Sequence, residues 1–416
     1  MIENILIQYI PRIVRIRYEI LVIFLSSTYF WFLPVAETSV QNNLFFGADT
    51  ERNFRVISGD PLADHYRNLT HPFFTILATI PVRTIHLFNS EINALTSYVL
   101  VFGVMGAFFF WKVLSSIIQP LLALSILLVF FASNTVRIWS ILSETFIATF
   151  ATLMLSTYLI IKRKNWVLIF LISMSANIFC LLLPVICSII IEKRKYKNLA
   201  KNLLIFSPLA IAISIFQRSL APSSGYFFDF VHISSDKEFV AFSIDAIPFR
   251  IFDFFISPFI MPHRDLLTLP LTSRAIWSNA TSTRSTLNEN VAFWAMLICI
   301  LLILSLLAFA VITTISTRFH TENKVLRSIV LFTIFQLIFY SFYGDEPFLY
   351  SYMFFPFILV IIGFAMKRIP RLGILIFISL ACLMQLVNFS PVDVEIQNCT
   401  VDEDSIYLLF MNYVCK

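Results

Sequence analysis

The strongest constraint on the fold is a series of long apolar runs separated by short polar segments. The runs at 94–114 and 291–312 are typical: each holds about 20 residues with at most one charge. An α-helix of about 20 apolar residues crosses the roughly 30 Å hydrocarbon core of a bilayer. Only 13% of the residues are charged, against about a quarter in soluble domains. The sequence therefore excludes an ordinary soluble protein and predicts one that crosses a membrane several times.

The spans are predicted to be helical. The chain has 46 phenylalanines and only 8 glycines, and it lacks the repeated ten-residue alternation of a transmembrane β-barrel. We therefore expect an all-α, polytopic bundle of about eleven spans. Two of these are short helices within 167–191, and the others are 20–36, 94–114, 118–133, 145–161, 202–216, 291–312, 325–343, 348–366 and 372–389.

The positions of basic residues predict the orientation. Arg12, Arg15 and Arg17 precede the first span, which predicts an uncleaved anchor with a cytoplasmic N-terminus. Basic clusters at 162–164 and 193–201 bound the run 167–191. A single crossing would place these clusters on opposite sides, so we expect a hairpin of two short helices that turns near 175–177.

This topology divides the chain into a transmembrane domain, 1–389, and an outer tail, 390–416. A first outer loop, 37–93, contains an interfacial or re-entrant helix, because the segment 73–88 is short and interrupted by Pro81, Arg83 and His86. A second outer loop covers 217–290. In the tail, Cys399 and Cys415 could form a disulfide if the outer compartment is oxidising.

The outer face is predicted to be rich in arginine. Of the 30 lysines and arginines, 12 fall on the outer side in this topology, and ten of those are arginine. The planar guanidinium suits phosphate better than a lysine ammonium does, so this face could hold anionic ligands. A chance bias in composition is the alternative interpretation. The net charge of +5 indicates no nucleic-acid partner.

No glycine-rich phosphate loop occurs in the sequence, which argues against a nucleotide or nucleotide-sugar site. If the protein transfers a group, we expect the activated donor to arrive within the membrane on a lipid phosphate. No cofactor is predicted.

The polar stretch 44–81 is the main candidate for chemistry. It holds four carboxylates, three arginines and two histidines between Gly47 and Phe74. Asp49 could act as a general base, and a solvated loop acid is the alternative. The candidate substrate-binding residues around it are Arg52, Arg55, Asp64, His65, Arg67 and His71.

Metal binding is not predicted for this stretch, because the spacing of Asp64, His65 and His71 matches no standard zinc motif. His71 precedes Pro72, and this pair could instead fix the entry of the short helix, since proline suits a first helical turn.

Two further outer segments contribute candidate substrate-binding residues. Arg137 and Glu144 lie between the third and fourth spans. Glu144 either caps a helix or belongs to the site. Glu346 and Tyr350 lie in GDEPFLYS, and Tyr352 follows just after it. The segment is either a simple turn or a place where aromatic rings beside acids contact a sugar.

Taken together, GADTERNF with its acid, His71-Pro72, the Ser143-Glu144 helix start, the basic-flanked hairpin and GDEPFLYS resemble the polytopic GT-C glycosyltransferases that use polyprenyl-phosphate sugars. The length and phenylalanine content further resemble the phage-carried serotype-converting glucosyltransferases of O-antigen. The resemblance implies Asp49 as the catalytic residue, although the loop has no paired Asp-x-Asp.

The resemblance implies a particular sugar donor, acceptor and membrane. The donor would be an undecaprenyl-phosphate sugar, most simply glucose, and the acceptor a hydroxyl of lipopolysaccharide O-antigen. The protein would lie in the bacterial inner membrane, with its outer loops in the periplasm and membrane lipid around it. An O-antigen polymerase or ligase, or a flippase for a lipid-linked saccharide, are the alternatives. Transporters tend to carry mid-membrane charges and inverted repeats, and neither is evident here.

Overall fold

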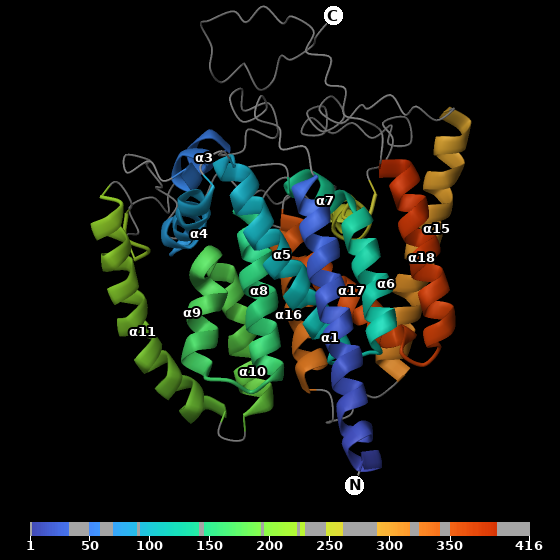
Figure 1. Ribbon diagram of the computed structural model, residues 1–416, viewed down its shortest axis with the longest axis horizontal. Coiled ribbons are helices and arrows are strands. Elements are labelled where there is room, and N and C mark those ends of the chain that lie inside the picture. The colour runs from blue at the N-terminus through green and yellow to red at the C-terminus, as the bar shows by residue number, and fades with distance from the viewer. Residues whose placement is uncertain are drawn as a thin grey trace, which may run out of the picture.

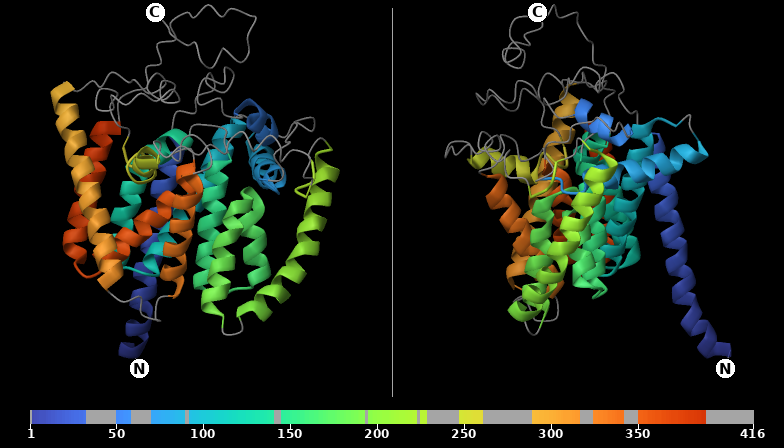
Figure 2. Two further views of the ribbon diagram at one scale, coloured as in Figure 1. Left: turned by 180° about the vertical axis from the view of Figure 1, so that it is seen from behind. Right: turned by 90° about the vertical axis from the view of Figure 1, so that its left-hand side faces the viewer.

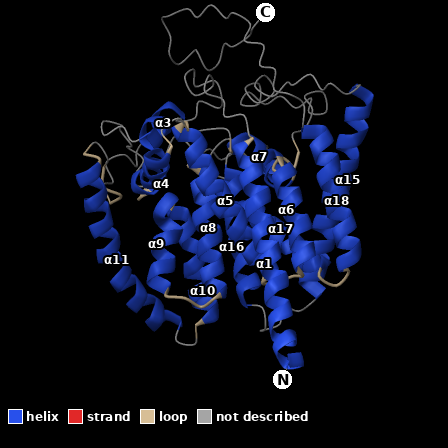
Figure 3. Cartoon of the chain, viewed as in Figure 1, coloured by secondary structure: helices blue, strands red, loops and turns tan. Residues whose placement is uncertain are grey.

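The computed structural model describes residues 2–32, 50–58, 70–89, 92–140, 145–192, 195–222, 225–228, 247–260, 289–316, 324–341 and 350–388. Within these ranges every regular element is a helix (Figures 1 and 3). The prediction of an all-helical chain is therefore confirmed for the described residues. Asp49, Asp64, His65, Arg67, Glu144, Glu346 and the tail with Cys399 and Cys415 lie outside them.

Most of the helices run side by side as a bundle (Figures 1 and 2). The bundle helices are α1 (Ile2–Trp31), α5 (Ala94–Ser115), α6 (Pro120–Ala132), α8 (Phe146–Ile161), α9 (Trp166–Ala176), α10 (Leu182–Ile191), α11 (Lys195–Leu220), α15 (Glu289–Ser316), α16 (Lys324–Tyr340), α17 (Ser351–Met366) and α18 (Pro370–Asn388).

Four shorter helices lie at the end of the bundle away from the N-terminus, which we call the distal end (Figures 1 and 2). They are α3 (Thr50–Ser58), α4 (Phe74–Phe88), α7 (Asn134–Trp139) and α13 (Ile247–Phe255). Helix α4 runs across the direction of the bundle, as the right-hand view of Figure 2 shows. This orientation is the one expected of an interfacial helix.

Among the described residues, four helical stretches are long and apolar enough to cross a membrane: Ala94–Ser115, Tyr196–Leu220, Trp294–Thr313 and Pro370–Val387. The chain is thus a helical protein of membrane type. Helices also occupy the other predicted spans, but several are shorter than the roughly 20 residues that a straight crossing needs. The number of about eleven crossings stays a prediction.

The first helix is longer than the apolar run suggested. We expected a span from residue 20, and α1 extends back to Ile2 without a break. The residues ahead of the apolar run include leucine, glutamine and arginine, which are tolerated well in helices. Pro11 is the exception, because a proline inside a helix removes one backbone hydrogen bond. Arg12, Arg15 and Arg17 therefore belong to the same helix as the first predicted span.

The hairpin predicted between the two basic clusters turns where expected. Helix α9 ends at Ala176, and the extended residue Asn177 separates it from the 3-10 helix η1 (Ile178–Leu181). The Asn177 side chain accepts a hydrogen bond of 2.9 Å from the Phe179 backbone N–H. An asparagine cap supplies an acceptor for a backbone donor that the new helix leaves unpaired.

Among the described elements, the most extensive helix pairing is that of α5 with α8. The Gly106 position on α5 lies against the Phe150 ring, and a Cβ added there would overlap two ring carbons. Phe150 in turn stacks on Tyr352 of α17, with 5.2 Å between ring centroids. Because residue 106 has no side chain, the Phe150 ring of α8 packs directly against the backbone of α5, and the two helices can lie close together.

Replacing Gly106 with leucine should separate α5 from α8. Overpacking of a dense core typically costs about 1–3 kcal/mol, so we expect a lower melting temperature for the purified protein. Ser305→Leu on the exposed face of α15 is the matched control and should change little. Equal melting temperatures for the two variants would contradict the tight α5–α8 contact.

Candidate functional site

The described candidate residues lie on elements of the distal end. Arg55 is exposed on α3, and its backbone carbonyl accepts a hydrogen bond of 2.9 Å from the Ser58 hydroxyl. Arg52 belongs to the same helix. Helix α3 is fixed to α4 by the Thr79 hydroxyl, which donates to the Val56 carbonyl at 3.0 Å. Because α3 begins at Thr50, it directly follows Asp49 in the chain.

His71 contacts the break between α9 and η1. Its Nδ1 donates to the Ala176 carbonyl at 2.6 Å, because a carbonyl oxygen can only accept. The neighbouring backbone adds two bonds, from Phe73 N–H to the Ser175 carbonyl at 3.0 Å and from Ile178 N–H to the Thr70 carbonyl at 2.9 Å. This geometry favours the interpretation in which His71 fixes the entry of α4.

Gln217, which the sequence did not single out, completes this attachment. Its side chain is fully buried. Its amide nitrogen donates to the Pro72 carbonyl at 3.1 Å, and its amide oxygen accepts from the Ile76 N–H at 3.3 Å. Helix α11 thus holds the first turn of α4 through one amide. The sequence feature that could have indicated this contact is a glutamine directly after the apolar run 202–216. We predicted instead that it begins the second outer loop.

Replacing Gln217 with leucine should loosen α4 selectively. The substitution keeps the approximate size but leaves a buried carbonyl and N–H without a partner, which costs about 1–3 kcal/mol. We expect faster hydrogen exchange at the amides of Phe74 to Ala78 with little change in α18. Uniformly faster exchange across both helices, or unchanged exchange in α4, would contradict this role.

Arg137 is carried by α7, a short helix held at its start by the segment after α13. The Asn134 side-chain amide donates to the Ser257 carbonyl at 3.1 Å. The backbone N–H groups of Asn134 and Thr135 donate to the carbonyls of Phe259 and Pro258, each at 3.1 Å. These three contacts link residues more than a hundred positions apart and fix the helix that presents Arg137.

The other end of α7 is also tied down. The hydroxyls of Ser140 and Tyr352 lie 2.5 Å apart, which links the chain after α7 to α17. Tyr352 is fully buried. We expected Tyr352 and Tyr350 to lie together where a sugar could touch them. For Tyr352 this is wrong, because its ring is buried against Phe130 and Phe150.

The Arg137 side chain is half-buried and lies in the electrostatic field of the Tyr29 phenol on α1. Burial lowers the pKa of the Arg137 guanidinium, and the Tyr29 phenol opposes that shift. A partly desolvated guanidinium interacts more strongly with an anion than a fully hydrated one does. Arg137 thus combines a fixed position with the chemistry of a phosphate-binding group.

Tyr350 is half-buried at the start of α17. Its ring stacks on Tyr340, with centroids 4.4 Å apart and planes at 10°, and it meets Phe146 edge-on at 6.0 Å. The Tyr340 hydroxyl donates to the Met353 sulfur at 3.0 Å. One ring face of Tyr350 is therefore occupied by protein.

Arg250, one of the predicted outer arginines, is only 4% exposed. Its Nη1 donates to the Ser341 carbonyl at 2.6 Å and so joins α13 to the end of α16. This arginine has a structural contact that sequence reasoning did not predict. Within the described ranges, no three His, Cys, Asp or Glu side chains come close enough to hold a metal ion.

Comparisons with models of known protein families, with curated proteins and with solved structures gave no match. The class that the structure defines is therefore the coarse one: a helical protein with several helices long and apolar enough to cross a membrane, and with short helices across its distal end.

Proposed function

We propose that the protein is a membrane glycosyltransferase that moves a sugar from a polyprenyl-phosphate carrier to a polysaccharide hydroxyl. The observation that supports it best is the fixed presentation of Arg137 at the distal end, on a helix braced at both ends. Helix α3, which follows Asp49, lies at the same end (Figure 1). Tyr350 precedes the first turn of α17, which the Ser140–Tyr352 contact holds beside α7.

In this proposal Asp49 acts as general base. The acceptor hydroxyl oxygen attacks the anomeric carbon of the donor sugar as its proton passes to the Asp49 carboxylate. The bond between the anomeric carbon and the phosphate oxygen breaks, and the lipid phosphate leaves with the electron pair. Attack from the face opposite the leaving group inverts the anomeric carbon.

The remaining candidate residues divide between the phosphate and the sugars. Arg137, with Arg52, Arg55 and Arg67, would stabilise the negative charge on the departing phosphate. Asp64, His65, Glu144, Glu346 and Tyr350 would contact the sugars. His71 would act at a distance, by holding α4 in place through the Ala176 carbonyl.

The proposal includes the membrane arrangement. The chain would cross a bacterial inner membrane about eleven times, with a cytoplasmic N-terminus and the distal end in the periplasm. The donor would be an undecaprenyl-phosphate hexose, most simply glucose, and the acceptor an O-antigen chain. Arg137 and the arginines of the first outer loop would suit a lipid phosphate that lies at the membrane surface.

A reconstituted transfer assay tests the proposal. Purified protein in liposomes receives a polyprenyl-phosphate donor with a radiolabelled sugar, together with lipopolysaccharide as acceptor. We expect label in the polysaccharide and an equal amount of free polyprenyl phosphate. Movement of the lipid-linked sugar across the bilayer without transfer, or chain extension that needs no monosaccharide carrier, would overturn it in favour of a flippase or a polymerase.

A further inference from the structure

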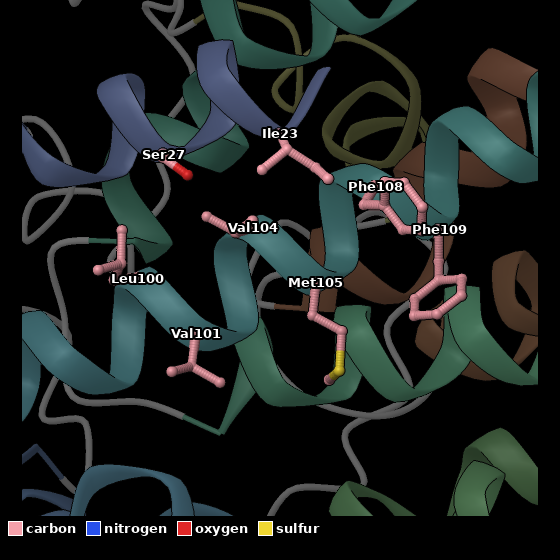
Figure 4. A pocket seen from close by; sticks show the side chains of 8 residues that line it. All are labelled: Ile23, Ser27, Leu100, Val101, Val104, Met105, Phe108 and Phe109. Carbon is pink, nitrogen blue, oxygen red and sulfur yellow. The ribbon is translucent and has the colours of Figure 1, made fainter. Parts of the chain in front are cut away.

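An apolar groove of about 400 Å³ runs between α1 and α5 (Figure 4). Ile23 and Ser27 line it from α1, and α5 supplies the other lining side chains, from Leu100 to Phe109. Ser27 carries the only polar side-chain group among the lining residues. Such a groove suits a hydrocarbon chain better than a sugar or a nucleotide.

One end of this groove leads to an ion pair. The Lys112 ammonium lies one helical turn beyond the groove residue Phe108, 5.2 Å from the centroid of that ring and 5.8 Å from that of Trp111. It pairs with Glu19 of α1. Glu19 likewise lies one turn from the groove residue Ile23. The pair therefore joins α1 to α5 on the side of the groove nearer the N-terminus.

The charge at that end favours an anionic headgroup. Glu19 is engaged by Lys112, and α1 continues toward its N-terminus with the exposed Arg17. Arg15 and Arg12 follow in the same helix, and the next acid is Glu3. With Glu19 paired to Lys112, the exposed Arg17 adds one positive charge on α1, and a basic side chain near the membrane surface attracts lipid phosphates.

The length of the groove fits one fatty-acyl chain. The lining residues of α5 run from Leu100 to Phe109, nine positions or about 14 Å along a helix at 1.5 Å per residue. One leaflet contributes about 15 Å of hydrocarbon. A chain seated between Leu100 and Phe108 would thus place its phosphate close to the level of Lys112 and Arg17.

We propose that the groove between α1 and α5 binds one acyl chain of an anionic phospholipid from the leaflet on the N-terminal side, with its phosphate beside Arg17. This site lies toward the opposite end of the bundle from Arg137 and is independent of the proposed transfer activity. Its ligand is a resident lipid that steadies the contact between α1 and α5.

Native mass spectrometry of the protein released from nanodiscs tests this site. Nanodiscs of palmitoyl-oleoyl phosphatidylglycerol mixed equally with the phosphatidylcholine of the same chains supply the probe lipids. We expect one phosphatidylglycerol retained per chain by the wild type. Val104→Trp fills the groove and should abolish retention, and Arg17→Gln should lower it about fivefold, the effect of one basic residue near an anionic surface.

Two matched variants serve as controls. Leu301→Trp adds the same side chain to an exposed face of α15, and Arg368→Gln removes an exposed charge after α17. Both should retain phosphatidylglycerol as the wild type does. Equal retention of the two lipids, or unchanged retention by Val104→Trp, overturns the proposal. A wild-type dimer that Val104→Trp converts to a monomer would assign the groove to a second copy instead.

Discussion

Asp49→Asn is expected to abolish sugar transfer while leaving membrane insertion intact. Asparagine has nearly the same size as aspartate but cannot accept the proton of the acceptor hydroxyl. Loss of a positioned general base typically costs about 10²- to 10⁴-fold in rate. The measurement is transfer from a polyprenyl-phosphate sugar in liposomes, with the amount of inserted protein quantified in the same preparation.

The matched control is Asp60→Asn, the same substitution in the same outer loop. It should retain most of the activity, because we assign Asp60 no role in the reaction. Full activity of a normally inserted Asp49→Asn variant would refute the assignment of the base. Labelling of a cysteine at position 49 from the cytoplasm would refute the orientation on which the assignment depends.

The sequence predicted the fold better than it predicted the contacts at the distal end. The turn after Ala176 followed from two basic clusters that must share one side of the membrane, and the structure has its helix break there. The first residue of α1 was harder to predict. The apolar run shows where the chain can cross a membrane but not where the helix begins, and α1 extends beyond that run through three arginines.

Side-chain roles at the distal end depend on partners that are distant in the chain. Gln217 bonds to Pro72 and Arg250 to Ser341, so each looked like an ordinary loop residue until its partner was known. Tyr352 looked accessible because it adjoins a polar turn, but it packs inside the bundle. The local sequence shows which positions are polar and with what helical or strand periodicity the apolar residues recur. It does not show which distant carbonyl a side chain will hydrogen-bond to.

Arg137→Gln is expected to reduce transfer by about 10- to 150-fold, because hydrogen bonds to a charged group contribute about 1.5–3 kcal/mol. The glutamine keeps a polar side chain at a half-buried position but removes the charge that the leaving phosphate needs. The reduction should appear in kcat/KM for the lipid donor. Arg137→Lys keeps the charge without the planar fork, so it should show an intermediate loss.

Arg83→Gln is the matched control, since Arg83 is an exposed arginine on α4 at the same end of the bundle and has no assigned role. It should leave kcat/KM within about twofold of the wild type, as surface substitutions usually do. An unchanged kcat/KM for the lipid donor in a folded Arg137→Gln variant would contradict phosphate binding. A loss of activity fully explained by a lower melting temperature would contradict it too and assign Arg137 a structural role.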